Sequence, residues 1–355
     1  MFKKLIEKLA TWEHWPFYIF YFPISFKWFW YYIKSGSLWF FTASNPTMEF
    51  GGFEGGSKTK VAKLLPPQLY PNSILINPSS KFSEVKKEVL LHELLYPFIV
   101  KPDIGMKGLL FRVVKNEKQL KKYHAAIPAN YVIQEFVNMP YEVSVFYYRK
   151  PDEENGCITA LIKKKLLHVI GDGKNTLHEL IKNHLEFSIS SRQVKKRYGK
   201  EGERILEAGE KYYLSHIANL QNGARFINLY DEIDAKMLHV FDKISHSNNF
   251  YYGRYDIKCS TIEDIREGEN FKILEFNGSG SVPNHIYAGG FNLLDAYKEI
   301  LKHWEALYDI SEFNNKNGIR YWSFFKGYRF LMNSKKHFNI LKRLDKVLFL
   351  IEVEK

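Results

Sequence analysis

Hydrophobic and polar residues alternate in short runs along the chain, and this pattern predicts β-strands and amphipathic helices. Predicted strands cover residues 73–77, 98–103, 109–114, 131–137, 141–148, 157–165, 252–259 and 272–277. Predicted helices cover residues 83–95, 117–126, 177–187, 188–211, 231–247 and 292–308. From Tyr96 onward the strands come in pairs, which differs from the small α/β pattern before it.

The first 45 residues are unusually rich in tryptophan, tyrosine and phenylalanine. From Trp15 to Ile33 the only full charge is Lys27, and this length approaches the ~20 apolar residues that span a bilayer. Pro16 and Pro23 interrupt the stretch, and amphipathic aromatic side chains favour the headgroup region of a membrane. We therefore expect an arm that lies in the membrane interface, with nearby lysines facing anionic lipid. An arm packed on the body of the protein and a transmembrane helix are the alternatives.

Composition narrows the class of protein and of partner. The chain has 355 residues, 45% of them hydrophobic and 25% charged, which is typical of a globular protein with two or three subdomains. A net charge of +12 indicates anionic partners, such as nucleotides, acidic substrates, nucleic acid or an anionic membrane surface. No nucleic-acid-binding module signature accompanies the basic residues, which disfavours nucleic acid. The two cysteines, Cys157 and Cys259, lie far apart and predict a reducing, cytoplasmic compartment.

Two of the predicted strands deliver polar side chains to one side. Because side chains on a strand alternate with a period of two, Arg254 and Asp256 share a face, and so do Glu275 and Asn277. Two carboxylates and a carboxamide oxygen suit a hard divalent cation that also binds a polyphosphate. The sequence therefore predicts Asp256, Glu275 and Asn277 as metal ligands.

Lysines and glutamates that could bind a nucleotide precede these predicted metal ligands in the chain. Lys101 ends a buried-type strand before a glycine-flanked turn that contains Lys107, and Glu135 and Glu142 lie seven residues apart. Together with the predicted metal ligands Asp256, Glu275 and Asn277, this order of residues resembles that of the ATP-grasp ligases, of which D-alanine–D-alanine ligase is one. The Gly-Asp-Gly segment at 171–173 resembles that of cyanophycin synthetase. The resemblance covers roughly residues 97–290.

The resemblance implies an α+β, ATP-grasp fold in which two α/β subdomains hold ATP between antiparallel sheets. It implies ATP and two Mg²⁺ ions as cofactors, with Mn²⁺ able to replace Mg²⁺. The ATP-binding residues that it implies are Lys101, Lys107, Gln134, Glu135, Phe136, Val137, Glu142, Lys163, Lys165 and Asn219. The implied catalytic residues are Arg254, Lys101 and Lys165. Strand alternation puts Lys163 and Lys165 on one face and Lys164 on the other, and we assign the first pair to the phosphates.

The substrate side departs from the family pattern. The phosphate loop is reduced to residues 104–108, and the acceptor region does not match D-alanine ligases, so that substrate is not carried over. The candidate substrate-binding residues are Arg225, Ser279, Ser281 and His285. The glycine-rich segment Gly51–Lys58 is either a hinge or a loop that binds a carboxylate or phosphate.

These observations divide the chain into five segments. We expect the aromatic arm at 1–48, a small α/β lead-in domain at 49–96, the ATP-grasp small subdomain at 97–148, the large subdomain at 149–310, and a basic aromatic helical tail at 311–355.

The predicted function is an ADP-forming carboxylate–amine (or thiol) ligase, peripheral at the inner face of a membrane. Its expected partners are small-molecule or lipid-linked carboxylates and amines, and an anionic membrane surface. A kinase-like phosphotransferase and a catalytically silent, ATP-binding membrane scaffold are the alternatives.

Overall fold

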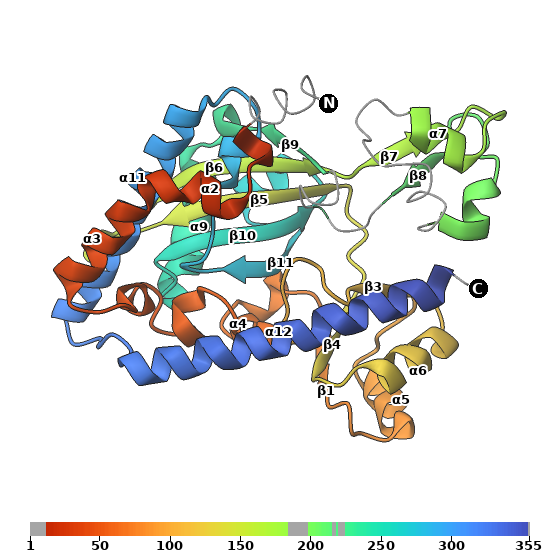
Figure 1. The fold of residues 1–355 in the computed structure, drawn as a ribbon, viewed down its shortest axis with the longest axis horizontal. Helices are drawn as coiled ribbons and strands as arrows, with labels where there is room; N and C mark the ends of the chain where they lie inside the picture. Colours follow the sequence, from red (N-terminus) through yellow and green to blue (C-terminus); the bar gives the residue numbers. More distant parts are fainter. Residues whose placement is uncertain (1–11, 184–197, 215–217, 219–223, 354–355) are drawn as a thin grey trace.

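The computed structural model describes residues 12–183, 198–214, 218 and 224–353 (Figure 1). Its strands are β1 (Ser73–Ile76), β2 (Phe98–Pro102), β3 (Arg112–Val114), β4 (Tyr131–Glu135), β5 (Tyr141–Tyr148), β6 (Cys157–Lys165), β7 (His168–Ile170), β8 (Lys211–Tyr213), β9 (Arg225–Asn228), β10 (Tyr252–Cys259) and β11 (Phe271–Asn277). They form a four-stranded sheet in the order β1–β4–β2–β3, a five-stranded sheet in the order β11–β10–β5–β6–β9, and the pair β7–β8. Every pairing is antiparallel, so the predicted α+β class with antiparallel sheets is confirmed.

The four-stranded sheet packs against α5 (Phe82–Leu91) and α6 (Glu117–Ala126). Their contact buries a core that includes Val85, Leu120 and the strand residue Val100. The side chain of Asn116 caps the start of α6, since its oxygen accepts from the backbone N–H of Gln119. The chain segment before Tyr96 contributes β1 to this sheet.

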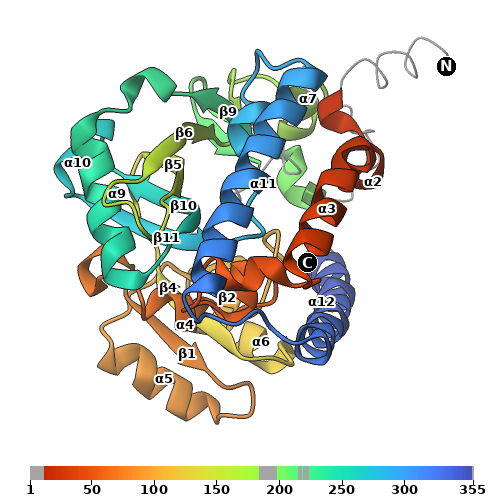
Figure 2. The same cartoon turned by 90° about the vertical axis from the view of Figure 1, so that its left-hand side faces the viewer.

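The five-stranded sheet has helices on both faces (Figure 2). One face packs on α9 (Ala235–Asn248) and α10 (Ile262–Glu267), with Phe241 and Tyr255 fully buried between the layers. The opposite face packs partly on α11 (Leu293–Lys316), which buries Phe146 and Leu307. The rest of that second face is left for polar residues.

The last helix, α12 (Phe324–Val353), runs from the large sheet to the small one (Figure 1). Phe330 packs with the aromatic core beside the large sheet, whereas Leu341 is buried in the core of the small sheet. Asp345 accepts from the backbone N–H of Leu110 and pairs with Arg112 at 3.2 Å. This one helix therefore fastens the two sheets to each other.

The aromatic arm packs on the body through one side. It contains α2 (Phe17–Tyr21) and α3 (Ser25–Ser35), and α3 lies beside α11 in both views (Figure 1, Figure 2). Phe20 and Tyr31 are buried against α11, and the Tyr31 ring stacks on Tyr308. No helix in the described part of the chain is long and apolar enough to cross a membrane.

Two helix predictions need correction. A helix continuing to Lys211 is wrong in its described part, because Gly199–Glu203 is a 3-10 turn and Lys211 begins β8. Gly199 and Gly209 take positive φ angles there, which an α-helix does not allow. The helix expected from Asp231 begins after Asp234, whose side chain caps α9 by accepting from the N–H of Met237.

Candidate active site

Polar side chains cover one end of the large sheet, on the face away from α9. Register places them as neighbours across four strands: they are Glu142, Ser144, Lys164, Arg254, Asp256, Lys258, Glu275 and Asn277. Residues opposite each other in an antiparallel pair share a face, so adjacent strands hold these side chains next to each other.

Asp256 is the centre of this cluster. Its carboxylate accepts two hydrogen bonds from Arg254, at 3.1 and 3.0 Å, and one from the Lys164 ammonium at 2.8 Å. The carboxamide of Asn277 donates to the same carboxylate at 3.2 Å. Burial alone would raise the pKa of Asp256, but the two cations outweigh it and hold the pKa well below its usual range. Asp256 is therefore ionised at neutral pH.

Glu275 lies beside Asp256 on the edge strand and receives a cation from outside the sheet. Lys58, the first residue of α4 (Lys58–Ala62), approaches Glu275 to 3.3 Å and donates to the Gly105 carbonyl at 2.8 Å. Burial by itself would raise the pKa of Glu275, but the nearby cations Lys58 and Lys101 outweigh this effect. The net pKa is therefore lowered, and the carboxylate is charged. Lys58 thus joins the loop after β2 to the end of β11.

Lys101 reaches the same region from the small sheet. Its ammonium donates to Gln134 Oε1 at 2.9 Å, and burial lowers its pKa to about 8, with Glu275 acting in the opposite direction. The amide nitrogen of Gln134 is buried beside the Tyr70 hydroxyl. Lys101 and Gln134 therefore place polar groups of the small sheet next to Glu275 of the large one.

The acidic residues at this site fit a divalent cation that also binds a ligand. Asp256 and Glu275 stand opposite each other in register, and Asn277 keeps its carboxamide oxygen for a further bond while its N–H groups face Asp256. In the described part of the chain, no group of three acidic, histidine or cysteine residues is placed to hold a metal alone. A Mg²⁺ ion, which keeps several water or phosphate ligands, needs no such cage.

The loop after β11 returns over the polar face. Asn284 donates to Ser144 Oγ at 3.0 Å, next to Asp256 in register, and Ser279 Oγ is buried with no partner among the described residues. The backbone N–H of Ser279 donates to the Gly51 carbonyl at 3.1 Å. A side chain at Gly280 would put a Cβ within 1.9 Å of the Phe53 carbonyl oxygen, so the two loops pack backbone to backbone.

Comparisons with known proteins point in one direction. No family model matches the chain. Cyanophycin synthetase of Geminocystis herdmanii is 25% identical over 213 residues, which cover 54% of this chain and 24% of that protein. D-alanine–D-alanine ligase of Bacillus anthracis has a TM-score of 0.40 at 14% identity, over 74% of this chain and 69% of that one. The ATP-grasp ligase PsnB, solved with a minimal precursor, has a TM-score of 0.38 at 12% identity, over 70% of this chain and 60% of that one.

This chain is similar to ATP-grasp ligases. The resemblance predicted from the sequence, to D-alanine–D-alanine ligase and cyanophycin synthetase, is therefore confirmed. The chain spans about a quarter of the length of its curated relative, and the structural likenesses have TM-scores below 0.5.

Among the ATP-grasp positions predicted from the sequence, the lysines of β6 need correction. Lys164, not Lys163 or Lys165, faces Asp256 and also lies 3.5 Å from Glu142. The Lys163 ammonium sits 3.7 Å from the centre of the Tyr141 ring, and Lys165 pairs in register with Arg225. Strand alternation separates the lysines into two faces, but only the packing of the sheet decides which face is polar.

The other predicted positions lie in different surroundings. Glu142 lies in the polar cluster, where burial raises its pKa and Lys164 partly offsets the rise. Glu135 is exposed and accepts from the backbone N–H of Asn72, while Val137 is buried. Ser281 donates to the Asn277 carbonyl, and Lys107 is exposed in the loop after β2. Asn219 lies outside the described residues.

Sequence reasoning missed Lys58 because it precedes the region of resemblance to ATP-grasp ligases. Its signal was the segment Gly51–Lys58, which we interpreted as either a hinge or an anion-binding loop. The backbone N–H of Lys58 donates to the Asp103 carbonyl, and Asp103 accepts from the N–H of Thr59 at 2.9 Å. These bonds fix the lysine at the site and could not be read from the spacing.

The lowered pKa of Lys101 predicts how stability depends on pH. The unfolded chain keeps this proton to about 10.5 and the folded protein releases it at about 8, so the free energy of unfolding should rise between these pH values. Lys101→Met should remove about 2–3 kcal/mol of that rise. Urea unfolding at pH 7, 8, 9 and 10 measures it, with exposed Lys115→Met as the control. An unchanged slope in Lys101→Met would contradict the assignment.

Proposed function

We propose that the protein is an ATP-dependent ligase that activates a carboxylate as an acyl phosphate, which an amine then captures. The main observation in support is the ionised pair Asp256 and Glu275 on adjacent strands. Four cationic side chains surround this pair: Arg254, Lys164, Lys58 and Lys101. An excess of cations around two acids suits a ligand with several negative charges, such as the phosphates of ATP.

Each group has a role in this proposal. Asp256, Glu275 and Asn277 hold Mg²⁺, which neutralises phosphate charge and keeps the nucleotide in position when it is bound. Lys101, Lys164 and Lys58 bind the remaining phosphate oxygens. Adenine lies against the backbone of residues 134–137, and the ribose hydroxyls donate to Glu142.

The reaction follows from that arrangement. A carboxylate oxygen of the substrate bonds to the γ-phosphorus as the bond to ADP breaks, and Arg254 stabilises the charge on the transferred group. The amine nitrogen then bonds to the acyl carbon as phosphate leaves. Catalysis by this site is therefore mainly positioning and electrostatics.

The substrate's proposed link to a membrane rests on the outer side of the aromatic arm. Large hydrophobic side chains stand exposed along α2, α3 and the turn between them: Phe17, Tyr18, Ile19, Phe22, Phe26, Phe29, Trp30 and Ile33. Monomeric soluble proteins seldom expose a continuous apolar patch of this kind. Trp39 donates to the Phe324 carbonyl, which brings the exposed aromatic residues at the start of α12 beside the arm.

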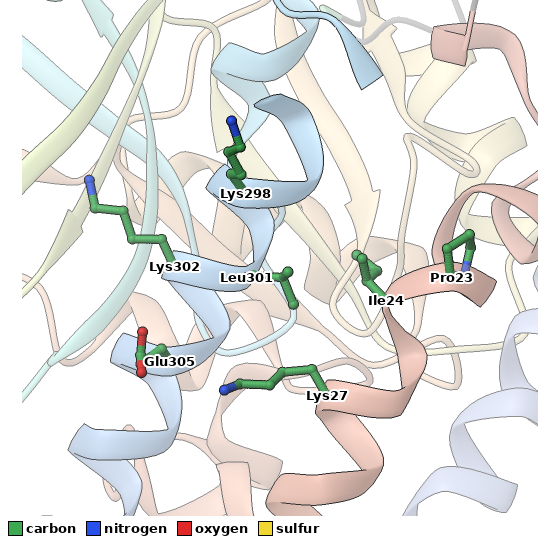
Figure 3. A pocket seen from close by; sticks show the side chains of 7 residues that line it. All are labelled: Pro23, Ile24, Lys27, Lys298, Leu301, Lys302 and Glu305. Carbon is green, nitrogen blue, oxygen red and sulfur yellow. The ribbon is translucent and has the colours of Figure 1, made fainter. Parts of the chain in front are cut away.

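A basic groove lies next to this aromatic patch. It has a volume of about 420 Å³. Figure 3 shows Lys27 reaching from α3 toward Glu305 of α11, while Lys298 and Lys302 of α11 point away from Lys27. Glu305 supplies the one acid in its lining, and Pro23, Ile24 and Leu301 supply the apolar part. Lysines beside exposed aromatic rings are suited to anionic lipid headgroups.

The ligase reaction is tested by ADP release. We expect ADP to form when the protein, ATP and Mg²⁺ meet a carboxylate from a screen, with hydroxylamine added to trap the acyl phosphate as a hydroxamate. Glu275→Gln should lower the rate by about 100-fold or more, because the metal-bound phosphates lose a charged partner. Exposed Glu269→Gln is the control.

The alternatives give different results in the same screen. A kinase-like enzyme would leave a stable phosphorylated product and no hydroxamate. A silent scaffold would bind ATP equally well after Glu275→Gln and release no ADP with any acceptor. Either result would reject the ligase proposal.

The lysines of β6 offer a matched pair of variants. Lys164→Met should weaken ATP binding about tenfold, because a charge-assisted bond near the phosphates is lost. Lys163→Met, on the opposite face of the same strand, should bind ATP as the wild type does. Isothermal titration with MgATP measures both, and equal losses in the two variants would contradict the placement of the phosphates.

Membrane binding is tested with vesicles. In detergent-free buffer, the protein should sediment with vesicles of phosphatidylglycerol and phosphatidylcholine, and added salt should weaken this binding. Replacing Phe26, Phe29 and Trp30 by serine should reduce the bound fraction about tenfold or more. Leu90→Ser with Leu91→Ser is the control, since these residues lie on α5 and are even more exposed. If the wild-type protein stays in the supernatant, the proposed membrane binding is rejected, and the ligase proposal is unaffected.

A further inference from the structure

The last helix, α12, turns one line of side chains towards the small sheet. His337, Leu341 and Asp345 are spaced four residues apart, so they lie along one face of the helix. Leu341, in the middle of the line, is fully buried in the core of the small sheet. This apolar contact fixes the positions of the two polar side chains at the ends of the line.

Both polar side chains bind the backbone of the loop between β2 and β3, which contains the phosphate loop expected at residues 104–108. His337 Nε2 lies 2.8 Å from the carbonyl oxygen of Ile104, and the ring donates in this bond because a carbonyl oxygen can only accept. Asp345 accepts from the backbone N–H of Leu110 at 3.1 Å. One helix face therefore holds the loop at both of its ends.

The backbone of this loop needs such support. Lys107 and Leu110 have positive φ angles of 54° and 55°, an unfavourable conformation for a residue with a side chain. Leu110 is held in it by three contacts: Asp345 binds its N–H, the Tyr123 hydroxyl donates to its carbonyl at 3.0 Å, and its side chain is fully buried. Helix α12 thus contributes one of the contacts that stabilise the loop in this shape.

The bond from His337 also orients the N–H that follows Ile104. In a trans peptide the carbonyl oxygen and the next N–H point in opposite directions, and the bond between Ile104 and Gly105 is trans. The N–H of Gly105 therefore points away from α12. The N–H groups of residues 105–108 donate to no acceptor among the residues that the structure describes. Successive free N–H groups in a short turn are suited to phosphate oxygens.

The same helix also contacts the segment that carries Lys58. Ser334 of α12 packs against Gly55 so closely that no side chain would fit at that glycine. Lys58, three residues later, donates to the Gly105 carbonyl and lies 3.3 Å from Glu275. Helix α12 thus supports both the phosphate loop and the segment that joins this loop to Glu275.

We infer that His337 and Asp345 are positioning residues of the nucleotide site, which set the backbone of residues 104–110 so that its N–H groups bind the terminal phosphates of ATP. This role rests on the proposed function, because the nucleotide is part of that proposal. Both side chains act through the loop alone. Their effect is therefore confined to the phosphates and does not extend to adenine, which the proposed function places at residues 134–137.

The test compares two nucleotides that differ only in their phosphates. The full chain is titrated calorimetrically with ATP and with AMP in the presence of Mg²⁺. His337→Phe removes the donor to Ile104, and Asp345→Ala removes the acceptor for the N–H of Leu110. Each variant should bind ATP about tenfold more weakly and AMP as the wild type does, because only the terminal phosphates contact the loop.

Conservative variants separate the hydrogen bonds from general packing. His337→Gln keeps an N–H donor and Asp345→Asn keeps an oxygen acceptor, so both should bind ATP within about threefold of the wild type. Lys342→Ala, exposed on the same helix, is the control and should bind ATP normally. Without nucleotide, amide hydrogen exchange at residues 104–110 should be faster in His337→Phe and Asp345→Ala, with exchange in β10 unchanged.

Two results would overturn this inference alone: both variants bind ATP as the wild type does, or ATP and AMP lose affinity by the same factor. In either case α12 would serve only to stabilise the small sheet. If one of the two variants does not fold, the other still gives the comparison. A wild-type protein that binds no ATP would reject the inference together with the ligase proposal. A protein that binds ATP, shows the loss confined to ATP, and releases no ADP in the carboxylate screen would reject only the ligase reaction.

Discussion

The charge balance at Asp256 is the constraint on which the candidate site depends. A carboxylate this deeply buried is stable as an anion only because Arg254 and Lys164 supply cations from the same strand and from two strands away. Those cations reach it only in one register of β10, β5 and β6. The large apolar side chains on the opposite face, such as Phe241 of α9 and Tyr255 of β10, oppose any slip, since a one-residue shift would exchange the two faces.

The second requirement is that the two sheets stay close. Lys58 contacts both the loop after β2 and Glu275, and α12 packs on the cores beside both sheets. His337 of α12 also bonds the carbonyl of Ile104, the residue before Gly105. Segments that precede and follow the region resembling ATP-grasp ligases thus hold the proposed phosphate loop from two sides.

Helix α11 contacts both the large sheet and the aromatic arm. Between these two contacts lie the basic groove and a second cavity at His285. Lys302 lines both the basic groove and this cavity.

The sequence by itself determined which residues could act together on one strand, because the side-chain period of two depends only on local geometry. It therefore identified Arg254 with Asp256, and Glu275 with Asn277, and it separated Lys164 from Lys163 and Lys165. Only the tertiary structure decided which face of β6 turns towards Asp256, since that choice depends on packing against α9 and α11. The same holds for Lys58 and for the pairing of His285 with Glu299. These contacts join residues far apart in the chain, and no local pattern records them.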